Sequence, residues 1–126
     1  MSLETIRLSQ RAKDQLVRVK RDTKIKNWNV LCRWALCVSL AERSSPTPSD
    51  IPSDSSVEMS WKTFGGPDAD LYLALIVQRC HEDGLGTDEA TVESQFRLHL
   101  HRGIGYLFGD PRLKELPGLL ERAMLD

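Results

Sequence analysis

The hydrophobic pattern of the first third of the chain predicts a strand, a helix, a turn and a second helix. Apolar and polar residues alternate over 5–8, the period of a half-buried strand. Ser9 is a residue type that accepts hydrogen bonds at a helix start, so the first helix is predicted over 10–22. Its apolar positions recur every three or four residues and form one stripe, consisting of Leu8, Ala12, Leu16 and Val19.

The second helix is predicted from Trp28 to Ala41, with Thr23 or Asn27 as its cap. Apolar residues occupy nearly every side of this segment, which indicates a helix buried on all faces. A four-residue strand is not stable alone. One small domain is also expected to be too small to bury every face of so apolar a helix. We therefore expect a homo-oligomer, a dimer or a tetramer, and pairing of the strand with its copy in another chain is one solution.

The remainder of the chain predicts a polar loop and further helices. Residues 43–57 are rich in Ser, Pro and Asp, which is typical of a flexible polar loop. Alternation over 57–64 predicts a short strand. A third helix is predicted from Asp68 or Asp70 to His81.

A fourth helix is predicted to be capped by Thr87, and its apolar residues, spaced by four, continue to Leu107. Gly103 and Gly105 either loosen the end of this helix or allow close packing against it. A last amphipathic segment is predicted over 113–125, restarting at Pro117, a residue suited to a helix N-terminus.

These elements predict a mainly α fold in one domain spanning 1–126, a length typical of single domains. The N-terminal unit, 5–41, has the strand–helix–helix order of a ribbon-helix-helix module and is basic. The flexible polar loop over 43–57 follows, and 58–126 forms the helical remainder.

Charge is distributed unevenly, although the net charge of the chain is only −1. Nine basic and two acidic residues lie between Arg7 and Arg33, which gives this segment +7 and the rest of the chain −8. Such asymmetry indicates a surface that binds a polyanion.

Composition excludes several classes of protein. The apolar runs are interrupted by Arg33 and Arg79 and fall short of the roughly 20 residues that a membrane span needs. The first residues lack the pattern of a signal peptide, so a cytoplasmic protein without membrane contact is expected. The odd number of cysteines, which are Cys32, Cys37 and Cys80, favours buried free thiols.

Catalytic and metal-binding patterns have little support. The chain lacks the nucleophile-elbow, P-loop and zinc-protease motifs. Cys32 and Cys37 lie five positions apart, and His99 and His101 lie two apart, so neither pair shares one face of a helix. We therefore expect no catalytic residue, no metal site and no cofactor.

The basic segment is interpreted as a surface for the phosphate backbone of duplex DNA. The predicted DNA-binding residues are Lys20, Arg21, Lys24, Lys26, Arg18, Lys13, Arg11 and Arg7. The N-terminus of the second helix would add free N–H groups and a positive dipole end. Two alternatives are a ribbon-helix-helix repressor that reads a palindromic site through Thr5 and Arg7, and a scaffold whose basic face binds an acidic protein.

Three segments of the chain resemble the DndE family of DNA sulfur-modification (phosphorothioation) proteins. They are Ile6-Arg7-Leu8-Ser9, the run from Asn29 to Leu40 that contains Leu-Cys-Arg-Trp-Ala-Leu-Cys, and Leu98-His99-Leu100-His101-Arg102-Gly103-Ile104. The resemblance implies a small helical accessory protein that binds DNA, with nicked duplex as a candidate substrate. It also implies that other proteins of the system are partners and carry the sulfur chemistry. The family has a glycine-containing turn where this chain has Lys24 and Lys26.

Overall fold

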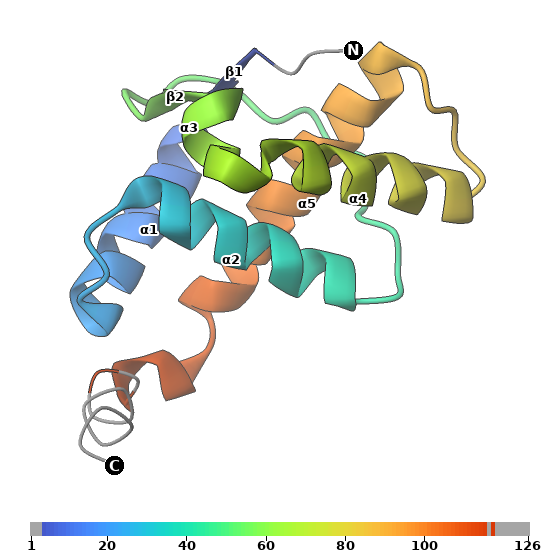
Figure 1. The fold of residues 1–126 in the computed structure, drawn as a ribbon. Coiled ribbons are helices and arrows are strands. Elements are labelled where there is room, and N and C mark those ends of the chain that lie inside the picture. The colour runs from blue at the N-terminus through green and yellow to red at the C-terminus, as the bar shows by residue number, and fades with distance from the viewer. Residues whose placement is uncertain (1–3, 116, 118–126) are drawn as a thin grey trace.

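The computed structural model describes residues 4–115 and Pro117, and most of them are helical (Figure 1). In chain order the elements are β1 (Thr5–Arg7), α1 (Gln10–Thr23), α2 (Trp28–Ala41), β2 (Glu58–Ser60), α3 (Trp61–Gly65), the 3₁₀ turn η1 (Gly66–Asp68), α4 (Ala69–Glu82), α5 (Glu89–Phe108) and the 3₁₀ turn η2 (Pro111–Glu115). The predicted mainly α fold, with a strand–helix–helix unit at its N-terminal end, is confirmed.

Helix α1 begins where its sequence predicts. The Ser9 hydroxyl accepts a hydrogen bond from the Ala12 amide at 3.1 Å, which satisfies one of the free N–H groups of the first turn. The predicted apolar stripe is confirmed, because its four members are all buried. Helix α1 ends one residue later than predicted, at Thr23, where Lys24 takes a left-handed conformation as the C-cap.

Helix α5 is the centre of the domain, and α1, α2 and α4 all pack against it (Figure 1). The buried side chains of the four helices, among them Leu16, Leu36, Ile76 and Leu100, form one continuous core. The packing of α1 on α5 and α2 fixes the direction of α1, and hence the surface that α1 presents to solvent.

The contact between α2 and α5 depends on Gly103. A Cβ atom at this position would lie 1.7 Å from the carbonyl oxygen of Ala35 in α2, so only glycine fits. At Gly105, two residues later, a Cβ atom would meet nothing within 4 Å. Of the two expectations for these glycines, close helix packing is correct for Gly103.

Strand β1 pairs with β2 of the same chain in an antiparallel two-stranded sheet, with Ile6 opposite Met59. A second copy of the chain is therefore not needed to give β1 a partner. The predicted strand over 57–64 is wrong in its length. The Ser60 hydroxyl accepts a hydrogen bond from the Thr63 amide at 3.0 Å, and this cap starts α3 at Trp61.

Two further predictions change at the C-terminal half. The cap of α5 is Asp88, whose carboxylate accepts hydrogen bonds from the Thr91 amide and hydroxyl, whereas Thr87 was expected. The same hydrogen bonds lower the pKa of Asp88. Of the predicted segment 113–125, the structure describes the end of η2 and Pro117 only, and the rest lies outside the described residues.

The segment 43–57 contains no helix or strand, and hydrogen bonds join several of its residues to the rest of the domain. Near its end, the Ser55 amide donates to the carbonyl of Leu8 at 3.2 Å, and Asp54 accepts from the Gln10 amide at 2.8 Å. In its middle, Arg97 of α5 donates to the carbonyl of Ile51 at 3.1 Å. These bonds hold the segment against the start of α1 and the face of α5.

Among the described residues, no helix has the length and apolar character required to cross a bilayer.

Candidate nucleic-acid interface

The solvent-facing side of α1 carries several of the predicted DNA-binding residues. Arg11, Arg18 and Arg21 are exposed and lie on the side of the helix opposite the buried stripe. Lys24 and Lys26 are also exposed and follow in the turn to α2. Asp14 and Asp22 are the two acidic residues of α1. We call the five exposed cations of α1 and the following turn the basic face.

Two of the predicted residues are engaged elsewhere. Arg7 forms an ion pair with Glu58 of β2 at 2.8 Å and also donates to the carbonyl of Ser55. Lys13 donates to the hydroxyl of Ser56 at 2.7 Å. These contacts tie both cations to the loop and strand that cover the start of α1. A strand residue held by a carboxylate is poorly placed to read base edges, which counts against the repressor alternative.

Arg18 and Lys20 lie over aromatic rings. The guanidinium carbon of Arg18 is 5.6 Å from the ring centroid of Phe108, and Nζ of Lys20 is 4.0 Å from that of Trp28. Cation–π contacts restrict a long side chain without cancelling its charge. Both cations therefore keep their charge for a phosphate, and Lys20 is held against the first turn of α2.

The other members of the basic face take no part in the ion pairs of the described residues. They are Arg11, Arg21, Lys24 and Lys26. The adjacent N-terminus of α2 adds to the positive potential. Its cap residue, Asn27, makes no side-chain hydrogen bond to the first turn. Unsatisfied N–H groups at a helix start attract anions.

Acidic residues gather at the other end of the molecule. The end of α4, the following turn and the start of α5 carry Glu82, Asp83, Asp88, Glu89 and Glu93. Figure 1 shows this α4–α5 turn at the upper right, whereas the α1–α2 turn lies at the left. These five acidic residues therefore lie apart from the α1–α2 turn and its lysines.

Lys24 has an unusual backbone conformation. Its φ of 61° makes it the one non-glycine residue with positive φ among the described residues. A left-handed conformation costs a residue with a Cβ atom about 1–2 kcal/mol, and the amide of Lys24 uses it to donate to the carbonyl of Lys20 at 2.8 Å. The backbone of Lys24 is therefore strained in the turn that leads to α2.

We expect Lys24→Gly to raise the free energy of unfolding by roughly 0.5–1 kcal/mol, because the relief of strain exceeds the added entropy of the unfolded chain. Lys26→Gly removes the same charge at a residue without positive φ, so it should leave stability unchanged or lower it. Urea unfolding of both variants measures the difference. Equal effects of the two substitutions would contradict the strain at Lys24.

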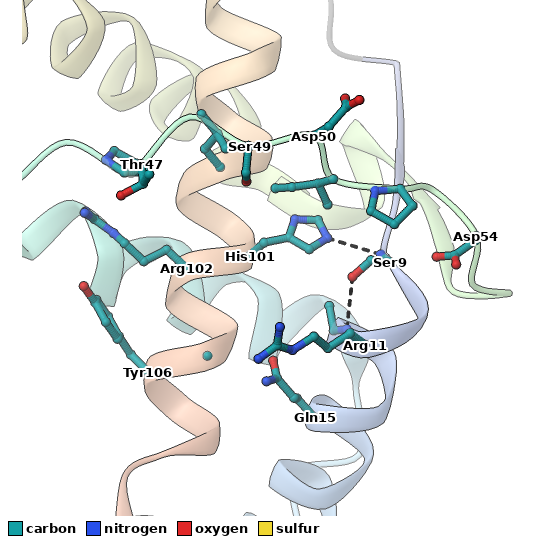
Figure 2. Close-up of a pocket in the computed structure, with 16 residues that line it drawn as sticks. Ser9, Arg11, Gln15, Thr47, Ser49, Asp50, Asp54, His101, Arg102 and Tyr106 are labelled. Carbon is teal, nitrogen blue, oxygen red and sulfur yellow. Dashed lines mark hydrogen bonds between the residues drawn. The ribbon is translucent and has the colours of Figure 1, made fainter.

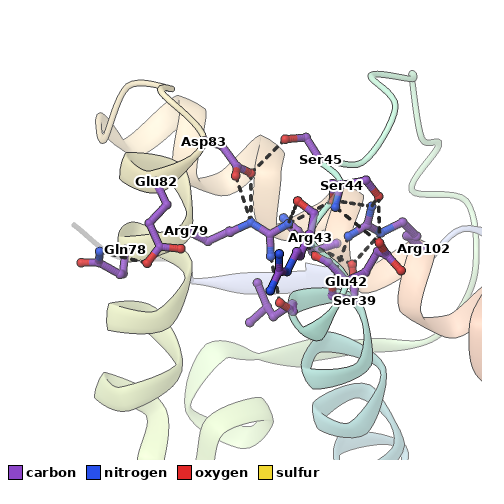
Figure 3. A network of polar contacts seen from close by, with 12 residues as sticks. Ser39, Glu42, Arg43, Ser44, Ser45, Gln78, Arg79, Glu82, Asp83 and Arg102 are labelled. Carbon is purple, nitrogen blue, oxygen red and sulfur yellow. Dashed lines mark hydrogen bonds and ion pairs between the residues drawn. The ribbon is translucent and has the colours of Figure 1, made fainter.

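The arginines that sequence reasoning missed lie inside the fold. Arg79 is buried and forms an ion pair with Asp83 at 3.0 Å, while its other nitrogens donate to four backbone carbonyls at and after the end of α2 (Figure 3). These carbonyls belong to Leu40, Glu42, Arg43 and Ser44. Arg102 donates to the carbonyls of Ser39 and Ser44, both at 2.8 Å. In the sequence, the position of Arg79 within an apolar helix was the one indication that this arginine is buried.

A buried histidine completes this network. Nδ1 of His99 is 2.8 Å from the hydroxyl of Ser39, which also accepts a hydrogen bond from Arg102. Burial, followed by the charges of Arg102 and Arg79, lowers the pKa of His99 to about 4. The imidazole is therefore neutral near pH 7 and serves the packing of α2 on α5.

The cysteines differ from their prediction at one position. Cys32 and Cys80 are buried, but Cys37 is exposed, so the expectation of three buried thiols is wrong there. Burial raises the pKa of Cys32 to about 12, which removes it as a nucleophile. The described residues contain no cluster of three or more His, Cys, Asp or Glu side chains able to hold a metal ion.

A cavity of about 690 Å³ opens beside the N-terminal end of the basic face (Figure 2). It lies between α1, the 46–54 part of the loop and α5, and Arg11 belongs both to its wall and to the basic face. Sequence reasoning did not find this cavity, because its walls come from three separate parts of the chain.

Comparison with known proteins identifies one family. A family model described as DNA sulphur modification protein DndE matches residues 5–115. A similar solved structure is DndE from Escherichia coli B7A, involved in DNA phosphorothioation modification, with 20% identity, a TM-score of 0.70, and coverage of 85% of this chain and 98% of that chain. Another is a double glycine-to-lysine mutant of DndE, involved in DNA phosphorothioation, with 19% identity, a TM-score of 0.65 and the same coverage. No curated protein matches the chain.

Proposed function

Because the chain belongs to the DndE family of DNA sulphur modification proteins, we propose that it is a non-catalytic DNA-binding accessory subunit of the DNA phosphorothioation system. In this proposal it holds duplex DNA, nicked duplex included, by the phosphate backbone. Other proteins of the system supply the sulfur chemistry. The observation that carries the proposal is the basic face along α1 and the α1–α2 turn.

The arrangement of this face favours backbone contacts over sequence reading. Its cations are long, flexible side chains spread along one helix and a turn, and such side chains neutralise phosphates without discriminating bases. The N–H groups at the start of α2 can bind one further phosphate oxygen beside Lys26. A non-catalytic role is supported by the burial of Cys32 and His99, the two groups with the largest pKa shifts.

The salt dependence of DNA binding tests this proposal. Each phosphate contact contributes about 0.9 to the slope of log K against log salt concentration. Replacing Lys20, Arg21, Lys24 and Lys26 by alanine should therefore make the slope shallower by about 3 to 4. It should also weaken binding at 50 mM salt by about a hundredfold or more. Fluorescence anisotropy of a labelled duplex over increasing salt measures both quantities.

Two controls make the result specific. Interchanging lysine and arginine at the same four positions keeps the charge, so it should keep most of the affinity. Arg43→Ala removes an exposed cation after the far end of α2 and should change little. Full binding by the four-alanine variant would refute the proposal. Absence of DNA binding by the wild-type chain, together with a co-purifying acidic protein, would favour the scaffold alternative.

We further propose that the chain acts as a homo-oligomer. Within one chain, α4 leaves Leu71 57% and Leu75 41% exposed, and α2 leaves Val38 38% exposed. Apolar residues exposed on neighbouring turns of a helix are typical of an interface between subunits. Several copies would also multiply the phosphate contacts of one basic face.

Light scattering should give a mass that is a multiple of the 14.3 kDa of one chain at micromolar concentration. Replacing Leu71 and Leu75 by glutamate should shift that mass to one chain, because burying two carboxylates in an interface is costly. Val17→Glu is the matched control, since Val17 is 50% exposed on α1, away from α4. A wild-type mass of one chain would contradict the proposal.

A further inference from the structure

The cavity beside Arg11 has no part in the backbone contacts described above. Its volume of about 690 Å³ lies within the range of about 300–1,000 Å³ that is typical of small-ligand sites. Apolar groups, including Ala12, Ile51, Leu98 and Gly105, line much of its wall. A ligand seated there would therefore bury a ring against apolar atoms and keep its polar edge toward the rim.

The polar groups of the wall are mostly fixed by the protein itself. Nε2 of His101 accepts a hydrogen bond from the Ser9 amide at 3.2 Å, and Nδ1 donates to the carbonyl of Arg97 at 2.8 Å. Arg102 is committed to the carbonyls of Ser39 and Ser44. Arg11 is exposed and takes part in none of the described ion pairs.

Tyr106 offers an aromatic surface at one side of the cavity. Its side chain is 43% exposed, and the guanidinium carbon of Arg102 lies 5.7 Å from its ring centroid. Figure 2 shows Arg102 and Tyr106 on one side, with Arg11 and Gln15 opposite them and His101 between. Arg102 therefore contacts the Tyr106 ring, while much of the ring stays exposed to solvent.

The charges of the rim exclude simple ions. Asp50 and Asp54 balance the charges of Arg11 and Arg102 in the lining, so the cavity has no excess positive charge to bind a free anion inside it, and Asp54 already accepts from the Gln10 amide at 2.8 Å. Two carboxylates, one of them engaged, are too few ligands for a divalent cation. The lining favours a neutral, planar group with polar edges inside the cavity, while the exposed Arg11 belongs both to the wall and to the basic face outside it.

We infer that this cavity takes one unpaired nucleobase of DNA that is bound along the basic face, a step that rests on the proposed function. The base would stack on Tyr106, its edge would face Gln15 and the hydroxyls of Thr47 and Ser49, and Arg11 would hold the adjoining phosphate. Stacking of an unpaired base on an aromatic side chain is a general mode of single-strand recognition. An unpaired base also enters a pocket more easily than one that must first leave its pair.

The test uses two labelled duplexes that contain 2-aminopurine, one with this base unpaired at a nick and one with it paired. Anisotropy gives the affinity of the full-length protein for each duplex, and the 2-aminopurine fluorescence reports stacking of the base. The wild type should bind the unpaired duplex about tenfold more tightly, within the range that base–aromatic stacking gives. The wild-type protein should also change the 2-aminopurine fluorescence of the unpaired duplex but not that of the paired duplex.

Gly105→Leu blocks the cavity, because Gly105 lines it and a side chain there begins in open space. This variant should lose both the tenfold preference and the fluorescence change, while it binds the paired duplex as the wild type does. Tyr106→Ala should behave in the same way, and Tyr106→Phe should keep both signals because the ring remains. Circular dichroism confirms that each variant is folded.

The outcomes separate this inference from the proposed function. Equal affinity of the wild type for the two duplexes overturns the inference and leaves backbone binding intact. Retention of the preference by both Gly105→Leu and Tyr106→Ala overturns it as well. Failure of the wild type to bind either duplex overturns the proposed function itself.

Discussion

Gly103→Ala is expected to lower the free energy of unfolding by about 3–5 kcal/mol. The added Cβ atom would lie 1.7 Å from the carbonyl oxygen of Ala35. Backbone atoms of two packed helices cannot give way as the end of a flexible side chain can, so α2 must shift along much of its contact with α5. Single domains are stable by about 5–15 kcal/mol, so this variant should lose a large part of its stability.

Gly105→Ala is the matched control for this prediction. It makes the same chemical change in the same helix, two residues away, where a Cβ atom meets nothing within 4 Å. Because alanine is the better helix former, this variant should be unchanged or more stable by up to about 1 kcal/mol. Urea unfolding followed by circular dichroism measures both variants, and similar stabilities would contradict the close packing of α2 on α5.

Arg79→Met is expected to destabilise the fold by about 3–5 kcal/mol, because it breaks a buried ion pair from one side. The Asp83 side chain, which is only 12% exposed, would be left without its partner. Four backbone carbonyls at the end of α2 would lose their donor at the same time. Methionine keeps most of the apolar length of the arginine, so the measured loss would report the polar contacts.

Arg112→Met is the corresponding control at the surface. Arg112 also pairs with a nearby aspartate, Asp110, at 2.7 Å, but its side chain is 85% exposed. Exposed ion pairs contribute about 0–1 kcal/mol, so this variant should unfold almost as the wild type does. If Arg79→Met and Arg112→Met cost the same in urea unfolding, the end of α2 is not held by Arg79 as described.

The elements that follow local rules could be predicted from the sequence. Ser9 caps α1 through an amide three residues away, and the buried stripe of α1 follows from spacings of three and four. The bounds of α2, Trp28–Ala41, follow from an apolar run with a polar residue on each side, Asn27 before it and Glu42 after it. In each case the interacting residues are close in sequence, so the pattern alone contains the information.

The parts that depend on distant contacts could not be predicted. The partner of β1 lies more than fifty positions away, with Arg7 opposite Glu58, and no short-range pattern points to it. The same distant contacts pair Arg7 with Glu58 and bring Lys13 within hydrogen-bonding distance of Ser56. Arg79 interrupts an apolar run in the sequence and Arg102 lies in a segment that carries the family resemblance, but only the fold shows that both reach the end of α2.

The distance between the basic α1–α2 turn and the acidic α4–α5 turn is expected to give the molecule an electric dipole even though its net charge is only −1. A polyanion such as DNA exerts little net pull on a nearly neutral particle at long range, but its field applies a torque to a dipole. The protein would turn during approach, with the α1–α2 turn leading and the α4–α5 turn trailing, before any contact forms. Orientation of this kind weakens as salt shortens the range of the field, so it would affect the association rate most strongly in dilute buffer.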